Sequence, residues 1–398
     1  MRKWIIGLVL AAICLNLWGC AKPSSPEPSA PISTDAPTNT DAPTQSSTAP
    51  QDPAPVSEPG VRVMNTDAGL QMAWETLANE YEQATGTDVR IVFSWDRATL
   101  RTISSGAELP KNCADLSAST ACAQLINNDL TLRNEQGQVL AVANNIEVFG
   151  LVYNSTLLAQ TAHTREDIGS FAELTEVVYS IMENAETYGF SAFTPVDANE
   201  HFAIQLATLS GNSRNLVDLI LNTAIFDSGS TEDGYKVKPL WQFVDGKAVF
   251  FLAGTRDQDV LSIIGSENMG VLPIYLGNEG EENQTLCVAA RSYWCVDGSA
   301  DPADVAATLD FLNFLTTPRA DGTLPADDLQ IMTPFRQASF VSNIPEQSLR
   351  SDVAQGKVPV VCPYVAQVPQ GLTEALMAYA ENPSDENWNN IRQIVEQE

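Results

Sequence analysis

Residues 61–106 switch repeatedly between the apolar spacing of a strand and that of a helix. Residues 61–64 and 89–93 alternate in polarity and predict two short strands. Between them, apolar residues recur at helical spacing over residues 70–81, and Gly86 occupies the position of a C-cap. Asp96 is placed to cap a further helix running to Gly106. This β-α-β-α order predicts an α/β fold with a largely parallel sheet.

The same alternation resumes later in the chain. Residues 148–153 predict a strand, and Ser170 and Glu173 form a capping-box pattern at the start of a helix. Asp301 followed by Pro302 is typical of another helix start. Closing helices are predicted over residues 372–380 and 388–394. About 338 residues follow residue 60, which is enough for two domains of ordinary size.

The first 20 residues have the composition of a secretory signal. Arg2 and Lys3 precede an apolar run over residues 4–15, which is too short to span a bilayer comfortably. Residues 17–20, Leu-Trp-Gly-Cys, resemble a bacterial lipobox, although the tryptophan is bulkier than the usual residue. The resemblance implies that Cys20 is lipidated and becomes the first mature residue. The alternatives are an ordinary secretory signal and an uncleaved helix.

Residues 21–60 have the composition of a disordered linker. They hold 10 of the chain's 23 prolines, among Ser, Thr and Ala, and few large apolar side chains. Proline keeps such a segment extended, so we expect a semi-rigid stalk. No later stretch reaches the roughly 18 apolar residues of a membrane helix. The acyl chains on Cys20 would therefore be the only anchor in the bilayer.

The charge balance excludes several classes of partner. The chain has 50 acidic and 21 basic residues, which gives a formal net charge of −29. Nucleic acids and anionic membrane faces both attract Lys and Arg, so neither is expected to bind the body. No metal site is predicted, because no CxxC pair occurs and His163 and His201 stand alone. We expect a monomer without a cofactor.

Five cysteines follow the predicted signal and its terminal cysteine, namely Cys113, Cys122, Cys287, Cys295 and Cys362. Cys113 and Cys122 are close enough in sequence to close a short loop, and Cys287 and Cys295 to close a hairpin. An exported protein permits both disulfides, whereas an anaerobic host would leave the thiols reduced. Because five is odd, at least one thiol is free or paired elsewhere.

Five stretches of the body occur in an order typical of one family. They are Ser-Trp-Asp-Arg-Ala-Thr-Leu at 94–100, Ile-Glu-Val-Phe-Gly-Leu-Val-Tyr-Asn at 146–154, Val-Asp-Gly-Lys-Ala-Val-Phe-Phe at 244–251, Met-Gly-Val-Leu-Pro-Ile at 269–274 and Tyr-Trp-Cys-Val at 293–296. Together they resemble the extracellular solute-binding proteins of ABC importers, in the broad group that includes maltose-binding protein. The resemblance covers nearly all of residues 61–398.

This resemblance implies a two-lobed fold of the periplasmic-binding-protein type, with α/β lobes joined by crossing hinge strands. Residues 61–145 and 292–340 would form the N-terminal lobe. Residues 146–291 and 341–398 would form the C-terminal lobe. The ligand would lie in the cleft between the lobes, which would close around it by a hinge motion.

A sugar-binding cleft needs hydrogen-bonding groups for hydroxyls and flat rings for C–H faces, so carboxylates should be mixed with aromatic residues. Residues at strand ends and at the predicted crossings between lobes have this mixture. The candidate ligand-binding residues are Asn65, Thr66, Trp95, Asp96, Glu147, Phe149, Phe193, His201, Arg256, Tyr293 and Trp294.

Several candidates also have a purely structural interpretation. The aromatic rings and His201 can be packing residues, Asp96 can cap a helix, and Glu147 can be a solvated charge. Arg256 stands where many members of the resembled family carry tryptophan, and it can pair with a nearby aspartate. An unpaired Arg256 would instead favour a ligand that carries a carboxylate or phosphate.

The resemblance implies the substrate-binding component of an ABC transporter, which catalyses nothing. Such a protein captures a small solute, here a sugar or oligosaccharide, and delivers it to a permease while anchored on the extracytoplasmic face, at the outer surface or in the periplasm. The alternatives are a ligand sensor that hands its bound form to a receptor, and a secreted carbohydrate-active enzyme. The sequence has no GxSxG, HExxH or Walker motif, although its 50 acidic residues offer many carboxylate pairs.

Overall fold

The computed structural model describes residues 60–194, 206, 209, 213–223, 239–339 and 343–396. The predicted signal, Cys20, nearly all of the predicted stalk and His201 lie outside these residues. In the part of the chain that the structure describes, no helix has both the length and the apolar character needed to cross a membrane.

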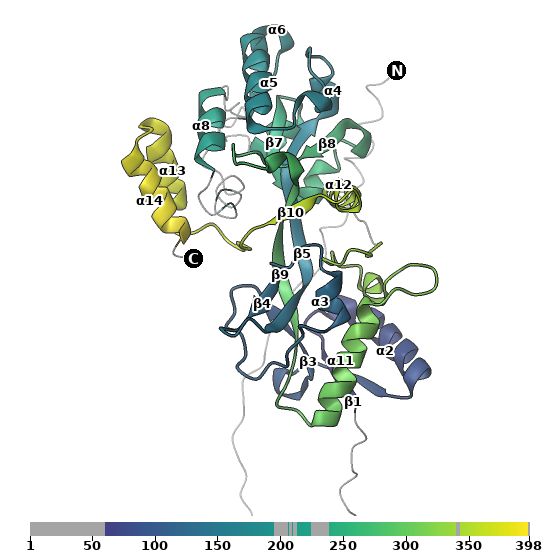
Figure 1. The fold of residues 1–398 in the computed structure, drawn as a ribbon. Coiled ribbons are helices and arrows are strands. Elements are labelled where there is room, and N and C mark those ends of the chain that lie inside the picture. The colour runs from purple at the N-terminus through teal and green to yellow at the C-terminus, as the bar shows by residue number, and fades with distance from the viewer. Residues whose placement is uncertain are drawn as a thin grey trace, which may run out of the picture. The chain divides into compact units, whose positions relative to one another are not determined.

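The strands are β1 Gly60–Met64, β2 Asp88–Val92, β3 Leu100–Ser104, β4 Thr131–Arg133, β5 Val139–Asn154, β6 Ser191–Phe193, β7 Ala248–Gly254, β8 Met269–Leu272, β9 Gln284–Val296 and β10 Val358–Val361. They form one sheet (Figure 1), whose main path runs β2-β1-β3-β9-β5-β7-β6. Strand β10 pairs with β9, and both β4 and β8 pair with β5.

The longer helices are α2 Gln71–Thr85, α5 Phe171–Glu183, α8 Arg214–Thr223, α11 Pro302–Thr316, α12 Ile344–Ala354, α13 Leu372–Glu381 and α14 Asp385–Glu396. The shorter helices are α3 Thr120–Gln124, α4 Ser155–Leu158, α6 Ala185–Tyr188, α9 Pro239–Val244 and α10 Gln258–Leu261. Single 3₁₀ turns are η1 Ala68–Leu70, η2 Trp95–Arg97, η3 Arg165–Asp167, η4 Thr255–Asp257, η5 Ser266–Asn268, η6 Glu281–Asn283 and η7 Pro325–Leu329.

The prediction of an α/β fold is confirmed, but the sheet is less parallel than predicted. Strand β1 runs parallel to β2 and β3, as the β-α-β order requires. The two longest strands, β5 and β9, run antiparallel to each other, and they also run antiparallel to β7 and β3, respectively. The reason is that the chain crosses the sheet in one direction in β5 and returns in the opposite direction in β9.

Residues 100–104 form strand β3, so the predicted helix from Asp96 to Gly106 is wrong. Helical structure there is limited to the single turn η2, which begins after Ser94. Leu100 packs in the main core, whereas Ile103 lies in a different hydrophobic cluster. Their spacing of three suits one face of a helix, but in a strand it places them on opposite faces. Backbone pairing with β9 along the whole segment stabilises the strand.

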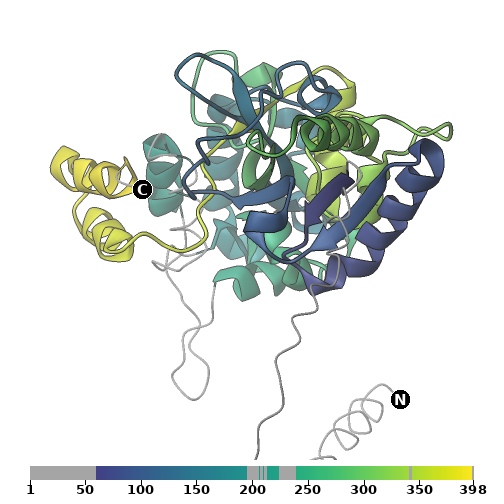
Figure 2. The same ribbon diagram turned by 90° about the horizontal axis from the view of Figure 1, so that it is seen from below.

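The predicted helix between the first two strands is confirmed as α2, which packs beside β2 (Figure 2). Its buried face consists of Trp74, Leu77, Ala78 and Tyr81. The helix ends at Gly86, whose φ of 76° is left-handed and whose N–H donates to the carbonyl of Glu82 at 2.8 Å. Glycine adopts this conformation without the steric cost of a Cβ atom.

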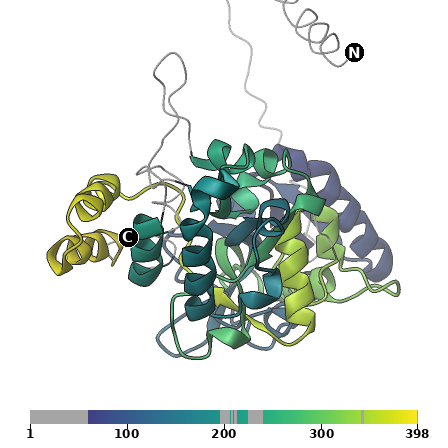
Figure 3. The ribbon, with the colours of Figure 1, turned by 90° about the horizontal axis from the view of Figure 1, so that it is seen from above.

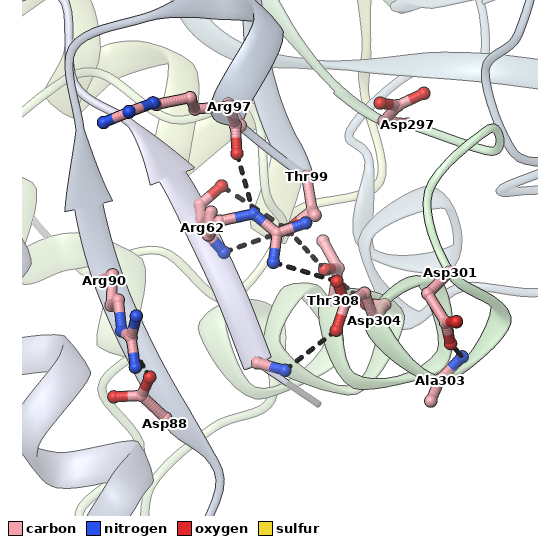
Figure 4. Close-up of polar contacts among 12 residues, drawn as sticks. Arg62, Asp88, Arg90, Arg97, Thr99, Asp297, Asp301, Ala303, Asp304 and Thr308 are labelled. Atoms are coloured by element: carbon pink, nitrogen blue, oxygen red, sulfur yellow. Dashed lines mark hydrogen bonds and ion pairs between the residues drawn. The ribbon is translucent and has the colours of Figure 1, made fainter. Parts of the chain in front are cut away.

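Polar contacts tie strand β1 to helix α11 (Figure 4). The guanidinium of Arg62 lies 2.9 Å from one carboxylate oxygen of Asp304, and the other oxygen accepts from the N–H of Gly60 at 3.0 Å. The predicted start of α11 is confirmed, because Asp301 accepts from the N–H of Ala303 at 2.9 Å. The first strand is therefore fixed to a helix that the chain forms more than 200 residues later.

Successive residues of β9 face opposite sides of the sheet. We call these sides the even face and the odd face of β9. The even face carries Leu286, Val288, Ala290, Trp294 and Val296, all of which belong to the main core. The odd face carries Cys287 and Ala289, which belong to a second core, and Cys295, which belongs to a small third cluster. Arg291, also on the odd face, is exposed between them.

The second core is covered by helices α5 and α8, which contact each other (Figure 3). The predicted start of α5 is confirmed, since the hydroxyl of Ser170 accepts from the N–H of Glu173 at 3.3 Å. The two predicted closing helices are also confirmed as α13 and α14, which lie side by side in Figures 1 and 3. They share a separate core, in which the rings of Tyr379 and Trp388 are 5.2 Å apart.

Candidate functional site

The centre of the odd face of β9 carries charged side chains in place of core residues. Glu147 of β5 pairs in register with Ala289, and Arg291 is the next residue on the same face of β9. The side chain of Glu147 is only 6% exposed. A carboxylate buried to this extent requires a partner that compensates for the lost hydration.

Arg256 supplies that partner. Pairing of Phe149 with Gly254 between β5 and β7 brings turn η4, which follows β7, next to Glu147. Atom Nη2 of Arg256 lies 2.9 Å from Oε2 of Glu147. The structure therefore brings together two residues that the sequence predicted as ligand contacts, although they are 109 positions apart.

Burial raises the pKa of Glu147 above its ordinary value. The positive charges of Arg256 and Arg291 act in the opposite direction, and they offset the burial only in part. The site thus contains a carboxylate whose ionisation depends on its arginine neighbours.

Tyr364, which follows β10, lies beside two arginines. The guanidinium carbons of Arg256 and Arg291 are 5.7 Å and 5.8 Å from the centroid of its ring, which is within the range of cation–π attraction. Nη2 of Arg256 also donates to the carbonyl of Val365 at 2.9 Å. We call Glu147, Arg256, Arg291 and Tyr364 the Arg256 cluster.

A cavity of about 500 Å³ adjoins the Arg256 cluster. It is lined by residues 363–370 together with Gly106 and Val395, so that Tyr364 belongs to both the cavity and the cluster. Its volume falls within the roughly 300–1,000 Å³ of small-molecule sites. The lining combines an aromatic ring with the amides of Gln367 and Gln370, which are groups suited to the C–H faces and hydroxyls of a sugar.

Tyr293 lies close to the same cavity. It stands on the odd face of β9, is half-buried, and forms a side-chain hydrogen bond with Ser105, the residue before Gly106. Burial raises the pKa of its phenol despite this hydrogen bond. Among the predicted ligand residues, the structure thus brings Tyr293, Glu147 and Arg256 to the centre of the odd face.

Three other predicted ligand residues belong to the core instead. Trp294 is 1% exposed, and its ring centroid lies 6.1 Å from that of Trp74 and 6.2 Å from that of Phe335. Phe149 and Phe193 are buried in the second core. A ring that is enclosed by apolar neighbours has no face left for a ligand, so these three predictions are wrong.

Asn65 organises the turn between β1 and α2. Its amide nitrogen donates to Oε1 of Gln71 at 3.0 Å, and its amide oxygen accepts from the N–H of Asp67 at 3.1 Å. The neighbouring Thr66 is exposed. A ligand contact by either residue stays a prediction.

Trp95 and Asp96 lie in turn η2, and neither is a member of the Arg256 cluster. Trp95 is half-buried against the small third cluster that also contains Tyr293, and the guanidinium carbon of Arg101 lies 5.0 Å from its ring centroid. Asp96 is exposed. Their role in ligand binding stays a prediction.

Sequence reasoning missed Arg291 and Tyr364 of the Arg256 cluster. Neither residue carried a sequence signal, because Arg291 is a lone charge inside an apolar strand and Tyr364 stands in an irregular segment.

The predicted disulfide pairs are also wrong. Cys287 and Cys295 both lie in β9, so their Cα atoms are about 26 Å apart at roughly 3.3 Å per residue. A disulfide requires Cα atoms within about 7 Å. Cys113 lies in the small third cluster, whereas Cys122 of α3 packs against the main core. All five thiols are free in the structure.

Solved structures with a similar fold are solute-binding proteins. The apo form of RafE from Streptococcus pneumoniae has a TM-score of 0.58 at 14% identity, over 87% of this chain and 98% of RafE. The bacterial solute receptor AcbH, described as having an exclusive preference for β-D-galactopyranose, has a TM-score of 0.59 at 10% identity, over 85% of this chain and 96% of AcbH. A probable secreted solute-binding lipoprotein from Streptomyces coelicolor has a TM-score of 0.58 at 12% identity, over 86% of this chain and all of that one (100%).

No family model and no curated protein sequence matches the chain. The likeness to the solved structures therefore concerns the fold, and it extends over nearly the whole length of each of them. The predicted fold is confirmed: the chain has the fold of the extracellular solute-binding proteins.

Proposed function

We propose that the chain is the substrate-binding component of an ABC transporter, which captures a sugar or oligosaccharide and delivers it to a membrane permease. The observation that carries the proposal is the fold that it shares with RafE and AcbH over most of each chain. In this proposal the protein binds its ligand and releases it chemically unchanged. No enzymatic step is part of its role.

The ligand is proposed to bind at the cavity beside the Arg256 cluster. Tyr364 and Tyr293 supply rings, and Gln367 and Gln370 supply amides that donate and accept hydrogen bonds. The galactopyranose preference of AcbH supports a sugar as the ligand class.

The ion pair of Arg256 removes the reason for expecting an anionic ligand, and we propose a neutral sugar. The ion pair with Glu147 already offsets the charge of Arg256, which the sequence left available for a carboxylate or phosphate. Arg291 remains exposed beside the ring of Tyr364 and can donate to sugar hydroxyls without requiring an anion.

We further propose that residues 61–145 with 292–340, and residues 146–291 with 341–398, act as two lobes. Strands β5 and β9 each run through both proposed lobes, so they are the proposed hinge strands. A ligand that binds the closed arrangement more tightly than the open one shifts the population toward closure.

The test is thermal unfolding of the purified chain against neutral sugars, amino acids and small anions. A ligand that binds only the folded state stabilises it by about 2.7 kcal/mol at a hundred times its Kd. We expect one neutral sugar to raise the midpoint and to be recovered unchanged. Stabilisation by anions alone would contradict the proposed ligand class, and turnover of the sugar would contradict the binding role.

Membrane attachment through Cys20 is also proposed, and the likeness to a probable secreted lipoprotein supports it. Replacing Cys20→Ser should move the protein from the membrane fraction to the soluble extracytoplasmic fraction, because the acyl chains are lost. Retention of the variant in the membrane would indicate an uncleaved N-terminal helix instead.

A further inference from the structure

Four of the five cysteines of the body are in contact as two pairs. Cys113 packs against the small third cluster that contains Cys295, and Cys287 and Cys362 both lie in the second core, so that the two thiols of each pair interact. Both pairs join residues that are far apart in sequence, and neither pair was predicted from the spacing of the cysteines.

The first pair is held in place by backbone contacts. Cys113 forms an isolated antiparallel bridge with Asp297, just beyond the end of β9. On either side of it, the N–H of Ala114 donates to Val296 at 2.9 Å and the N–H of Gly298 donates to Asn112 at 2.7 Å. These bonds keep the segment around Cys113 alongside the end of β9, which carries Cys295 on its odd face.

The second pair lies at the other end of β9. Strand β10 runs parallel to β9, and the N–H of Cys362 continues the pairing by donating to the carbonyl of Val288 at 2.9 Å. Cys287 and Cys362 are both buried in the second core. Ordered backbone on both sides therefore fixes these two thiols against each other.

We propose that the chain, once exported to an oxidising compartment, forms two disulfides, Cys113–Cys295 and Cys287–Cys362, and keeps Cys122 as a thiol. Each reaction joins two sulfur atoms and removes two protons and two electrons. The oxidant is a dithiol–disulfide exchange partner, whose disulfide is reduced to two thiols.

The first pair suits this exchange chemistry. Cys113 is half-buried, and the hydrogen bond from Cys295, with the charge of Arg101, lowers the pKa of its thiol. Its thiolate attacks the oxidant to form a mixed disulfide, and the sulfur of Cys295 then displaces the oxidant's second thiol. Cys122 packs against the main core rather than the small third cluster that holds Cys113 and Cys295, so it is not positioned to join that pair.

Each proposed disulfide would join β9 covalently to a segment that is distant from it in sequence. One would close the chain between residues 113 and 295, and the other between residues 287 and 362. Loops of this length restrict the unfolded ensemble, so the oxidised protein should unfold at a higher temperature than the reduced protein.

The experiment is peptide mapping of the full chain after refolding in a mixture of reduced and oxidised glutathione. Remaining thiols are alkylated with iodoacetamide before a non-reducing digest. Cleavage before Asp115 separates Cys113 from Cys122, and cleavage after Arg291 separates the two cysteines of β9. We expect the two proposed cross-linked peptides, with Cys122 alkylated.

Two results would overturn the proposal. One is alkylation of all five cysteines after oxidative refolding, and the other is a link between Cys113 and Cys122. The variant Cys122→Ser is the matched control and should retain both links. The variant Cys362→Ser should leave Cys287 alkylated while the Cys113–Cys295 peptide persists. None of these outcomes depends on ligand binding, so they test the disulfides separately from the proposed function.

Discussion

The even and odd faces of β9 differ along the same thirteen residues. On the even face, five side chains belong to one continuous core. On the odd face, two separate clusters are divided by the exposed Arg291, and Tyr293 at the edge of one of them is only half-buried. This division is where the Arg256 cluster and the cavity lie. We therefore expect the even face to determine stability and the centre of the odd face to determine ligand binding.

Replacing Trp294→Ala on the even face should have the largest effect. The change leaves a cavity between Trp74 and Phe335 and should cost about 3–5 kcal/mol of the free energy of unfolding. Urea unfolding measures this loss. The neighbouring variant Tyr293→Ala is the matched control and should cost clearly less, since its ring is half-buried. Equal losses would show that the two faces do not differ as described.

Replacing Arg256→Ala should be the next largest change. It leaves the buried carboxylate of Glu147 without its ion-pair partner, which should cost about 1–3 kcal/mol. The exposed Arg291→Ala serves as the control and should cost only about 0.5–1 kcal/mol, the value of an exposed cation–π contact with Tyr364. A comparable loss in both variants would mean that the ion pair does not stabilise the centre of the odd face.

The pH dependence of the free energy of unfolding, measured for the wild type and for Glu147→Gln, tests the buried carboxylate at the centre of the odd face. The folded state raises the pKa of Glu147 above its ordinary value of 4.5, so the folded state binds the proton more tightly than the unfolded state. This contribution to stability is complete below that ordinary value and is lost as the pH rises through the raised pKa. The stability of the wild type relative to the variant should therefore fall as the pH rises above the ordinary value of 4.5. A difference that stays constant or rises would contradict the raised pKa.

The smallest effect is expected for Tyr293→Phe. The variant keeps the ring and removes the hydrogen bond with Ser105, which should cost about 0.5–1 kcal/mol. A double-mutant cycle with Ser105→Ala should show that the two losses are not additive. Affinity for the ligand found by thermal unfolding should fall in the same variant, and unchanged affinity would place Tyr293 outside the binding site.

The sequence predicted the elements that depend on local patterns. The strand before α2, the buried face of α2 and the start of α11 at Asp301 are all confirmed, because each depends on periodicity or capping within a few residues. The segment after Asp96 was misassigned since Leu100 and Ile103 fit a helix locally, and only pairing with β9 makes it a strand.

The candidate site could be predicted by residue type but not by orientation. Tyr293 and Trp294 are adjacent aromatic residues in one strand, and nothing in the sequence indicates which of them faces the core. The pairing of Glu147 with Arg256 also depends on the register between β5 and β7, which is set by contacts that are remote in sequence.

The central position of β9 has a consequence for how the chain folds during synthesis. Strand β3 ends at Ser104, but its partner β9 begins only at Gln284. At a synthesis rate of roughly 5–20 residues per second, β9 is made on the order of 10–40 s after β3. During this time the unpaired edge of β3 is open to aggregation, and the long-range pairing makes the final closure slow. The central sheet is therefore completed only after the second crossing strand has been made.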